Sequence, residues 1–216
     1  MELVTGGAGF IGSHLVDSLV SKGLKVRVLD NFSSGRKEFL EHHSETNNVE
    51  IIIADLLDLD AVKSAMNGIE TVHHLAANPD IRLGTEITDT DLQQGTIATY
   101  NVLEAMRHNG VKRISFASSS AIYGEASVMP TPETYGPVLP ISLYGASKLA
   151  SEALISSWCG TFGGEAWINR FANIVGPRGT HGVIFDFIHK LKKDPNRLEV
   201  LGNGLQEKSY MSAEDC

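Results

Sequence analysis

The chain is poor in cysteine and in positive charge. Its 216 residues include 2 cysteines, and 18 lysines and arginines face 26 aspartates and glutamates, which leaves a formal net charge of −8. Two cysteines are too few for the disulfide framework of a small secreted domain. The acidic balance offers no basic surface to a nucleic-acid backbone or to anionic lipids. We therefore expect a cytoplasmic protein that binds neither nucleic acid nor membrane.

Long apolar runs and targeting patterns are also missing. No stretch approaches the roughly 18 apolar residues that a membrane-spanning helix needs. The first residues lack the basic-then-apolar pattern of a signal peptide. Yet 42% of the residues are hydrophobic, which is enough to build the core of one or two globular domains.

The sequence does contain a regular alternation of strand and helix patterns. Apolar runs predict strands over 2–5, 26–29, 49–54, 71–76 and 113–117, and helical patterns occupy 10–21 and 92–108. A further helix begins near Ser142, after a loop rich in proline and glycine. Continuous apolar strands are typical of sheets that are covered on both faces. The expected fold is α/β, a Rossmann-type doubly wound parallel sheet.

The stretch TGGAGFIG links the first strand to the first helix. Gly6, Gly9 and Gly12 form G-x-x-G-x-x-G, and such a turn lets backbone N–H groups at a helix start approach a phosphate. Asp30 ends the next strand, 18 residues after Gly12, close to the spacing of the acid that bonds an adenosine ribose. Its carboxylate would repel a 2′-phosphate, which favours NAD over NADP. A plain strand-to-helix turn and a helix-capping acid remain the alternatives.

Tyr144 and Lys148 form Y-x-x-x-K near the start of the later helix. Residues four apart share one helix face. A neighbouring ammonium, together with a positive nicotinamide ring, would lower the pKa of the phenol from its ordinary value near 10 and make it a general base. The alternative is an ordinary exposed helix face.

Ser118, Ser119 and Ser120 follow the strand expected over 113–117. In open α/β sheets, ligands bind beyond the carboxyl ends of the strands. A hydroxyl there would hydrogen-bond a substrate oxygen, unless the serines only satisfy the backbone at the strand end.

Six motifs in order resemble the extended short-chain dehydrogenase/reductases, and within them the NAD-dependent nucleotide-sugar epimerases and dehydratases. The motifs are TGGAGFIG, HLAA (74–77), SSSAIYG (118–124), YGASK (144–148), RFANIVGPR (170–178) and KSYMSAED (208–215). The resemblance is greatest to UDP-glucose 4-epimerases.

The resemblance implies a role for each matching position. Tyr144 would be the base, Lys148 would tune it, and Ser119 would be the catalytic hydroxyl. NAD would contact Gly6, Gly9, Phe10, Ile11, Gly12, Asp30, Asn31, Asp55, Leu56, Leu75, Ala76, Ala77, Arg82, Ser118, Tyr144 and Lys148. The substrate would contact Ser119, Ser120, Tyr144, Asn173, Val183 and Ile184.

The implied reaction is epimerisation of a nucleotide sugar at C4 through a 4-keto intermediate, with UDP-glucose and UDP-galactose as the favoured pair. A 4,6-dehydratase is the alternative, although Ser120 and Ala121 stand where dehydratases carry Asp-Glu. A decarboxylase is disfavoured for a similar reason. A non-catalytic dinucleotide-binding regulator is the alternative of another class.

The resemblance also implies two regions and a homodimer. We expect an NAD-binding Rossmann domain over 1–170 and a partial substrate-binding region over 171–216. The family's substrate domain is longer, so we expect the polypeptide to continue. Relatives pair through a four-helix bundle made by the helix over 92–108 and the Tyr144 helix.

Several other positions stand out. Gly95 occupies the place of a family asparagine that touches the nicotinamide end. Asp91 is interpreted as part of a solvated helix start. The pairs His42-His43 and His73-His74 lack metal-ligand spacing with cysteines or acids, so we expect packing and surface roles and no metal.

Overall fold

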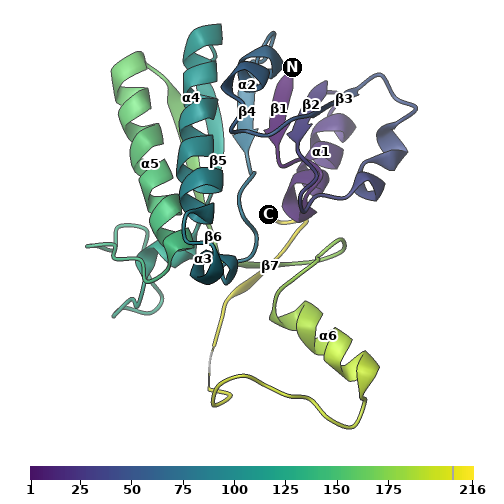
Figure 1. Ribbon diagram of the computed structural model, residues 1–216, viewed down its shortest axis with the longest axis vertical. Helices are drawn as coiled ribbons and strands as arrows, with labels where there is room; N and C mark the ends of the chain where they lie inside the picture. Colours follow the sequence, from purple (N-terminus) through teal and green to yellow (C-terminus); the bar gives the residue numbers. More distant parts are fainter. Residues whose placement is uncertain (206) are drawn as a thin grey trace. The chain divides into compact units, whose positions relative to one another are not determined.

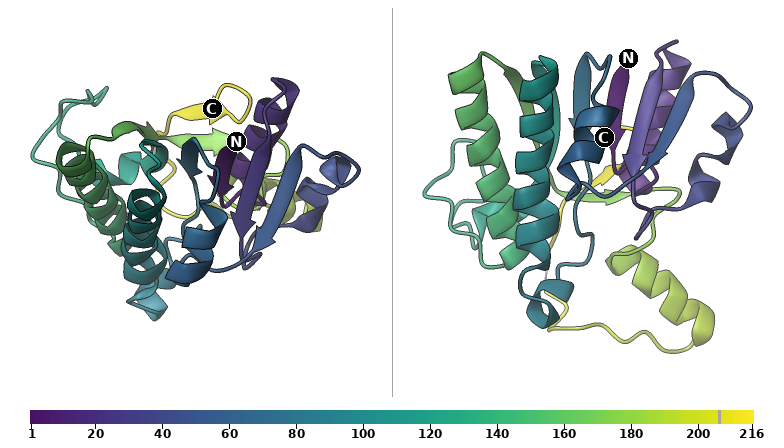
Figure 2. Two further views of the ribbon diagram at one scale, coloured as in Figure 1. Left: turned by 90° about the horizontal axis from the view of Figure 1, so that it is seen from above. Right: turned by 45° about the horizontal axis from the view of Figure 1, so that its top comes forward.

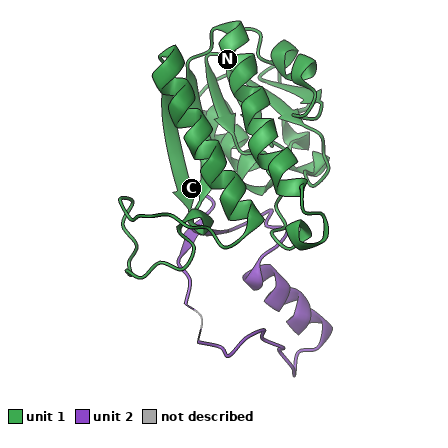
Figure 3. Cartoon of the chain, turned by 60° about the vertical axis from the view of Figure 1, so that its left-hand side comes forward, with its two compact units in different colours: residues 1–171 green, residues 172–216 purple. Residues whose placement is uncertain are grey.

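The computed structural model describes residues 1–205 and 207–216. Contacts within the chain divide it into two compact units, Met1–Phe171 and Ala172–Cys216 (Figure 3).

A six-stranded sheet forms the centre of the first unit (Figure 1). Its strands are β1 (Glu2–Thr5), β2 (Val26–Asp30), β3 (Val49–Ile53), β4 (Thr71–His74), β5 (Arg113–Ser119) and β6 (Glu165–Phe171). The order is β3-β2-β1-β4-β5-β6, and every neighbouring pair is parallel. This is the strand order of a dinucleotide-binding Rossmann fold, so the predicted fold class is confirmed.

Helices pack on both faces of the sheet, as Figures 1 and 2 show. The helices are α1 (Phe10–Ser21), α2 (Leu59–Ala65), the short α3 (Leu83–Glu86), α4 (Ala98–Asn109) and α5 (Leu143–Phe162). Side chains alternate along each strand. In β1, Leu3 therefore packs with α2, α4 and α5, whereas Val4 packs with α1.

The start of two helices is fixed by a side chain that caps the helix N-terminus. Asp58 accepts a hydrogen bond from Ala61 N (3.1 Å) at α2. Ser142 accepts one from Gly145 N (3.0 Å) at α5. Each bond satisfies a backbone donor that has no partner inside the helix. The cap of α5 explains why the helix begins immediately before Tyr144.

The segment predicted as one helix over 92–108 begins differently. Leu92–Ile97 form a π-helix, which continues into α4. Gly95 lies in this wider turn, and a Cβ there would stand 2.6 Å from Ser147 Oγ of α5. Glycine at this position therefore allows the turn to pack closely against α5. The sequence analysis, which compared Gly95 only with the asparagine of the family, did not reveal this packing.

The turn between β1 and α1 also needs glycine, because a Cβ there would meet neighbouring atoms. Gly6 has φ +69°, and a Cβ on it would lie 2.8 Å from the backbone of Ala76, just after β4. A Cβ on Gly12 would lie 2.1 Å from Gly6 O. Both positions thus require glycine for the fold itself.

The second unit contains a pair of parallel strands, β7 (Asn173–Val175) and β8 (Tyr210–Ser212), and the helix α6 (Val183–Lys193). Ala213 N donates to Val175 O (2.9 Å). A Cβ on Gly176 would meet Ala213 Cβ at 2.9 Å, so the strand pair is closely packed at this end. Within the described part of the chain, no helix is both long and apolar enough to span a membrane.

We predict opposite effects for two glycine-to-alanine substitutions. Gly12→Ala forces a methyl group onto backbone atoms and should lower the free energy of unfolding by about 2–3 kcal/mol. Gly160→Ala lies in α5 with no atom of the described residues within 4 Å of its Cβ, and should raise it by about 0.5–1 kcal/mol. Urea unfolding measures both. Equal effects would contradict the steric account of the turn.

Candidate active site

The parallel sheet gathers most of the predicted residues at one edge. Gly6 follows β1, Asp30 ends β2, Asp55 follows β3, Leu75 follows β4, and Ser119 ends β5. All strands run in the same direction, but the order in which they are added reverses at β1 and β4: β2 and β3 lie on one side of β1, and β4 to β6 lie on the other. Such a switch point opens the crevice in which α/β proteins bind nucleotides.

The glycine turn has the form of a phosphate site. Gly9 N donates to Gly6 O (3.0 Å), and α1 then begins with Phe10 and Ile11. Among the described residues, the only atom within 4 Å of a Cβ on Gly9 is Gly6 O, at 3.1 Å. Backbone N–H groups at the helix start can therefore approach an anion closely, and the first turn of α1 carries no acid to repel it.

Asp30 is buried and is held by the same turn. Its Oδ2 accepts from Ala8 N (2.9 Å), and its Oδ1 accepts from Phe32 N (2.8 Å). Each carboxylate oxygen can accept a second hydrogen bond. The geometry therefore joins the end of β2 to the glycine turn and keeps acceptors for a hydroxyl-bearing ligand.

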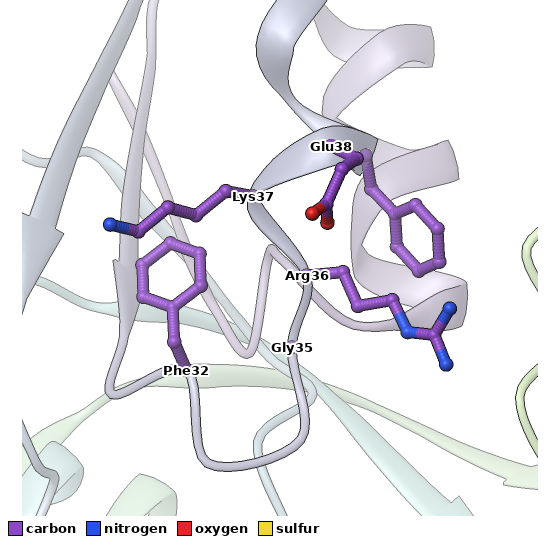
Figure 4. Close-up of a pocket in the computed structure, with 6 residues that line it drawn as sticks. Phe32, Gly35, Arg36, Lys37 and Glu38 are labelled. Carbon is purple, nitrogen blue, oxygen red and sulfur yellow. The ribbon is translucent and has the colours of Figure 1, made fainter.

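A cavity of about 450 Å³ lies in the segment after β2 and is lined by Phe32 and by residues 35–39 (Figure 4). Gly35 lines it and also abuts Asp30, because a Cβ on Gly35 would lie 2.9 Å from Asp30 Oδ1. Lys37 extends over the ring of Phe32, with Nζ 5.8 Å from the ring centroid, and Arg36 points to the opposite side. Sequence reasoning missed this cationic pair, which no motif marked.

Asn31, Asp55 and Leu56 form the next part of the edge. Asn31 Nδ2 donates to Asp55 Oδ2 (2.8 Å), which links the ends of β2 and β3. Leu56 is buried, and its carbonyl accepts from Asn101 Nδ2 (2.8 Å). Its side chain packs with the core below α2 and α4.

The segment after β4 lies against the glycine turn at its beginning and reaches the surface further on. Leu75 packs with the core under α1, and Ala76 abuts Gly6. Ala77 is half-buried. Arg82 is largely exposed at the start of α3, where its Nε contacts Asp80 Oδ1 (3.1 Å).

Tyr144, Ser119 and Lys148 come together between β5 and α5. The Ser119 side chain lies near the Tyr144 phenol and lowers its pKa. Ser119 Oγ accepts from Ala121 N (3.1 Å). Lys148 Nζ lies 5.7 Å from the centroid of the Tyr144 ring. The structure therefore brings together the three residues that the sequence predicts as catalytic.

Lys148 is almost completely buried, with 3% of its surface exposed. Its Nζ donates to Ala117 O (2.7 Å) and lies over the ring of Phe116 at 4.9 Å. Burial lowers the pKa of Lys148 to about 8, and the carboxylate of Asp91 opposes that shift. The ammonium keeps further donors besides the one given to Ala117.

The pKa of Tyr144 is raised in the protein chain by itself. Burial raises this pKa, the Ser119 side chain lowers it, and the charge of Asp91 raises it again. Desolvation of the phenolate is the largest of these contributions. The predicted lowering includes a positive nicotinamide ring, so it stays a prediction for the protein with its cofactor.

Asp91 corrects a prediction, because it is not part of a solvated helix start. Only 2% of it is exposed. Its Oδ1 accepts from Asn78 Nδ2 (3.1 Å), and its Oδ2 has no partner among the described residues. Its charge acts on both Tyr144 and Lys148. A helix-start pattern cannot reveal burial, which depends on the packing of the π-helix against α5.

His74 carries a buried chain of hydrogen bonds under the site. Its Nδ1 contacts Thr5 Oγ1 (2.7 Å), and its Nε2 contacts Thr99 Oγ1 (3.1 Å). Thr99 donates to Gly95 O (2.7 Å) and also contacts Ser151 Oγ at 3.1 Å. Burial lowers the pKa of His74 to about 3, and Lys148 adds to the shift. His74 is therefore neutral at pH 7, and its packing role is the expected one.

Ser118 faces a different network from Ser119. Its hydroxyl donates to Glu152 Oε1 (2.5 Å), and Arg170 forms an ion pair with Glu152 (Nη2–Oε2 2.8 Å). Arg170 also donates to Tyr123 Oη (3.0 Å) and Glu133 O (3.0 Å). The contacts with Glu152 hold the pKa of Arg170 above its ordinary value. This network ties the segment after β5 to α5 and β6, and the motifs marked only parts of it.

The remaining predicted residues are exposed. Ser120 begins a one-turn 3-10 helix after β5. In the second unit, Asn173 Nδ2 donates to Ser209 O (3.1 Å), and Val183 and Ile184 begin α6 with 43% and 39% exposure.

A family model described as the NAD dependent epimerase/dehydratase family matches residues 2–216. A protein of Methanocaldococcus jannaschii, provisionally named a UDP-glucose 4-epimerase, is 37% identical over 100% of this chain and 70% of its own length. UDP-glucuronic acid decarboxylase 1 of Xenopus tropicalis is 33% identical over 99% of this chain and 51% of its own length. The chain therefore spans between about half and 70% of these relatives.

Solved structures of similar enzymes also match this chain. A crystal structure of a UDP-galactose 4-epimerase is 47% identical, with a TM-score of 0.88, over 99% of this chain and 68% of that one. The dTDP-glucose 4,6-dehydratase DesIV of Streptomyces venezuelae, solved with NAD bound, is 26% identical, with a TM-score of 0.92, over 100% of this chain and 69% of that one.

We predict that His74 makes the fold sensitive to acid. The unfolded chain takes up a proton near pH 6.5, whereas folded His74 does so only near pH 3. The free energy of unfolding should therefore fall as the pH drops from 6.5 towards 4, by at most about 1.4 kcal/mol per pH unit from this group. Urea unfolding across that range should show a shallower fall for His74→Gln than for wild type. Exposed His108→Gln should follow wild type, and identical slopes in all three would contradict the assignment.

We also predict that the Glu152–Arg170 pair is important for stability. Glu152→Ala leaves Arg170 and Ser118 without their shared partner, and should lower the free energy of unfolding by about 2–3 kcal/mol. The exposed 27% of the Arg170 side chain keeps the loss below that of a fully buried pair. Glu104→Ala removes the surface pair with Arg107 and should have a much smaller effect. A loss no larger than that of the control would disprove the role.

Proposed function

Because the chain belongs to the NAD-dependent epimerase/dehydratase family, we propose that it binds NAD and acts on a nucleotide sugar, with 4-epimerisation of a UDP-sugar as the reaction. The observation that carries the proposal is the meeting of Tyr144, Ser119 and Lys148 at the carboxyl end of β5. These are the groups that proton transfer to and from a sugar hydroxyl requires.

The glycine turn and the ends of β1 to β4 would hold the cofactor. The pyrophosphate fits at Gly9 and the start of α1, where a Cβ is absent and backbone donors face outward. The adenosine ribose fits beside Asp30, whose carboxylate supports NAD over NADP. Asn31, Asp55 and Leu75 to Ala77 continue the same edge.

NAD, when bound, supplies a hydride acceptor and a positively charged ring. Tyr144 takes the proton of the sugar hydroxyl and later returns it. Ser119, beside Tyr144, holds the sugar oxygen. Buried Lys148 keeps a positive charge beside the phenol and has donors to spare for a ribose.

The raised pKa of Tyr144 indicates when this residue can act as a base. In the protein by itself, the phenol is protonated at neutral pH, since burial disfavours its charged form. Additional positive charge at the site is needed before Tyr144 can act as the base. The tyrosine thus becomes competent only in the presence of an oxidised cofactor.

The residues after Ser119 favour epimerisation over dehydration. Loss of water needs a further acid and base near the reacting sugar, and Ser120 and Ala121 carry neither. Relatives of both kinds exist, among them a decarboxylase and a dehydratase, so the reaction type is itself part of the proposal. UDP as the nucleotide rests on the names of several relatives.

Two other features belong to the proposal. Asn173, Val183 and Ile184 would contact the nucleotide part of the substrate, and the activity of the whole protein is proposed because the chain spans only part of its relatives. A homodimer through α4 and α5 would cover the apolar side chains that these helices and the turn before them expose, namely Ile97, Tyr100, Leu143 and Phe162.

The test is conversion of UDP-glucose to UDP-galactose with NAD, followed by chromatography. Tyr144→Phe should reduce turnover roughly 10²–10⁴-fold, because the base is lost, while NAD binding, measured by calorimetry, stays close to wild type. Tyr100→Phe is the matched control and should keep full activity, because it retains the aromatic ring that the proposed dimer would cover.

The alternatives give different outcomes. A 4-keto-6-deoxy product would indicate a dehydratase. NAD binding without any product from UDP-, GDP- or dTDP-sugars would favour the non-catalytic regulator, whose support is the replacement of asparagine by Gly95. Full turnover by Tyr144→Phe would exclude Tyr144 as the base.

A further inference from the structure

Two histidines and an aspartate lie close together in the first unit, away from the catalytic groups. Asp17 lies in the second half of α1. His42 and His43 belong to a 3-10 turn, Glu41–His43, in the connection between β2 and β3. His42 Nε2 lies 2.8 Å from Asp17 Oδ1, and His43 Nε2 lies 2.7 Å from the same oxygen. All three potential ligand atoms fall within 4.8 Å of one another.

The fold holds these side chains in place from both sides. Leu40, two residues before His42, is fully buried in the core that α1 forms with β1 and β2. Val16, immediately before Asp17, belongs to the same core. The carbonyl of His43 accepts from Thr46 N (3.0 Å) and Thr46 Oγ1 (2.8 Å). The convergence is thus built into the packing of the 3-10 turn on α1.

One side of the cluster is buried and the other is open. The His43 side chain is 8% exposed, that of Asp17 is 31% exposed, and that of His42 is 49% exposed. An ion could therefore enter beside His42 and keep water on its outer side.

We propose that Asp17, His42 and His43 form a binding site for a divalent transition-metal ion of the Zn²⁺ type. Two imidazole nitrogens and one carboxylate oxygen are ligands that Zn²⁺ takes, with water at the remaining position. Nitrogen ligands disfavour Mg²⁺ and Ca²⁺, which prefer an all-oxygen shell.

Binding requires only a small rearrangement. Zn²⁺ stands about 2.0–2.2 Å from nitrogen and oxygen ligands, so the three atoms would move slightly apart around the ion. Each neutral imidazole would carry its proton on Nδ1 and present the lone pair of Nε2 to the metal. The carboxylate neutralises part of the ion's charge, and Glu41 adds negative charge nearby in the sequence.

The consequence is structural rather than catalytic. An ion at this place would clamp α1, whose first turn forms the glycine-rich site, to the connection that follows Asp30. A ligand that binds only the folded chain stabilises it by mass action. The site does not depend on the proposed reaction, so either can fail without the other.

The sequence analysis did not predict this site, because it looked for cysteines and acids at metal-ligand spacing from the histidine pair. Asp17 lies 25 residues before His42, and only the packing of the turn on α1 brings it near. In the metal-free chain, the same atoms would act as two imidazole donors that share one carboxylate oxygen. Hydrogen bonding without metal affinity is therefore the competing outcome.

The experiment uses the whole chain, freed of metal with a chelator and dialysed. Calorimetric titration with ZnCl₂ should give saturable binding of one ion, and the melting temperature should rise with ZnCl₂ but not with MgCl₂. His42→Ala, at the exposed ligand, should weaken binding at least about tenfold. Asp17→Asn should do the same, whereas exposed His108→Ala should bind as wild type does.

Lowering the pH from 7.5 to 5.5 should weaken Zn²⁺ binding, because protons compete for the imidazole nitrogens. Circular dichroism at 25 °C checks that each variant is folded. No saturable Zn²⁺ binding, or binding that His42→Ala and Asp17→Asn leave unchanged, would overturn the proposal and leave the hydrogen-bonded cluster as the sole role.

Discussion

Parallel pairing of the strands is the constraint on which the site depends. Because β1 to β5 run in one direction, their carboxyl ends meet at one edge, and residues far apart in sequence, such as Thr5 and His74, become neighbours. The close contact of Gly6 with Ala76 fixes how near β1 and β4 approach at the switch point. A larger residue at Gly6 would disturb both the turn and the edge.

Around this edge the protein buries an unusual set of polar groups. Lys148, His74 and Asp91 are all at most 3% exposed, and burial without partners is costly. His74 avoids the free-energy cost of a buried charge because it is neutral and is hydrogen-bonded to two threonine hydroxyls. Lys148 and Asp91 instead keep opposite charges near each other, which supports the charged form of the lysine. Electrostatics near Tyr144 are therefore set by several elements together.

The sequence predicted most of the fold, because strand and helix periodicity is local. It also predicted Tyr144 and Lys148 as a pair, since their spacing on a helix is a local feature, whereas only the family resemblance singled out Ser119 among the three serines at the strand end. It was wrong about Asp91, and it did not foresee that burial raises the pKa of Tyr144 in the protein chain by itself. Both depend on how tightly the π-helix and α5 close over the site, and no local pattern reports that.

The sequence by itself determined the order of the elements, the glycine turn and the residue types at the strand ends. Hydrophobic periodicity and the absence of a Cβ at Gly6 and Gly12 are properties of the amino-acid sequence itself. The tertiary structure alone decided which polar groups are buried and which acidic side chains contact which basic ones. Desolvation and charge–charge contact act across distant segments, as between Asp17 and His43 or Ser118 and Arg170, so only the packed chain can set them.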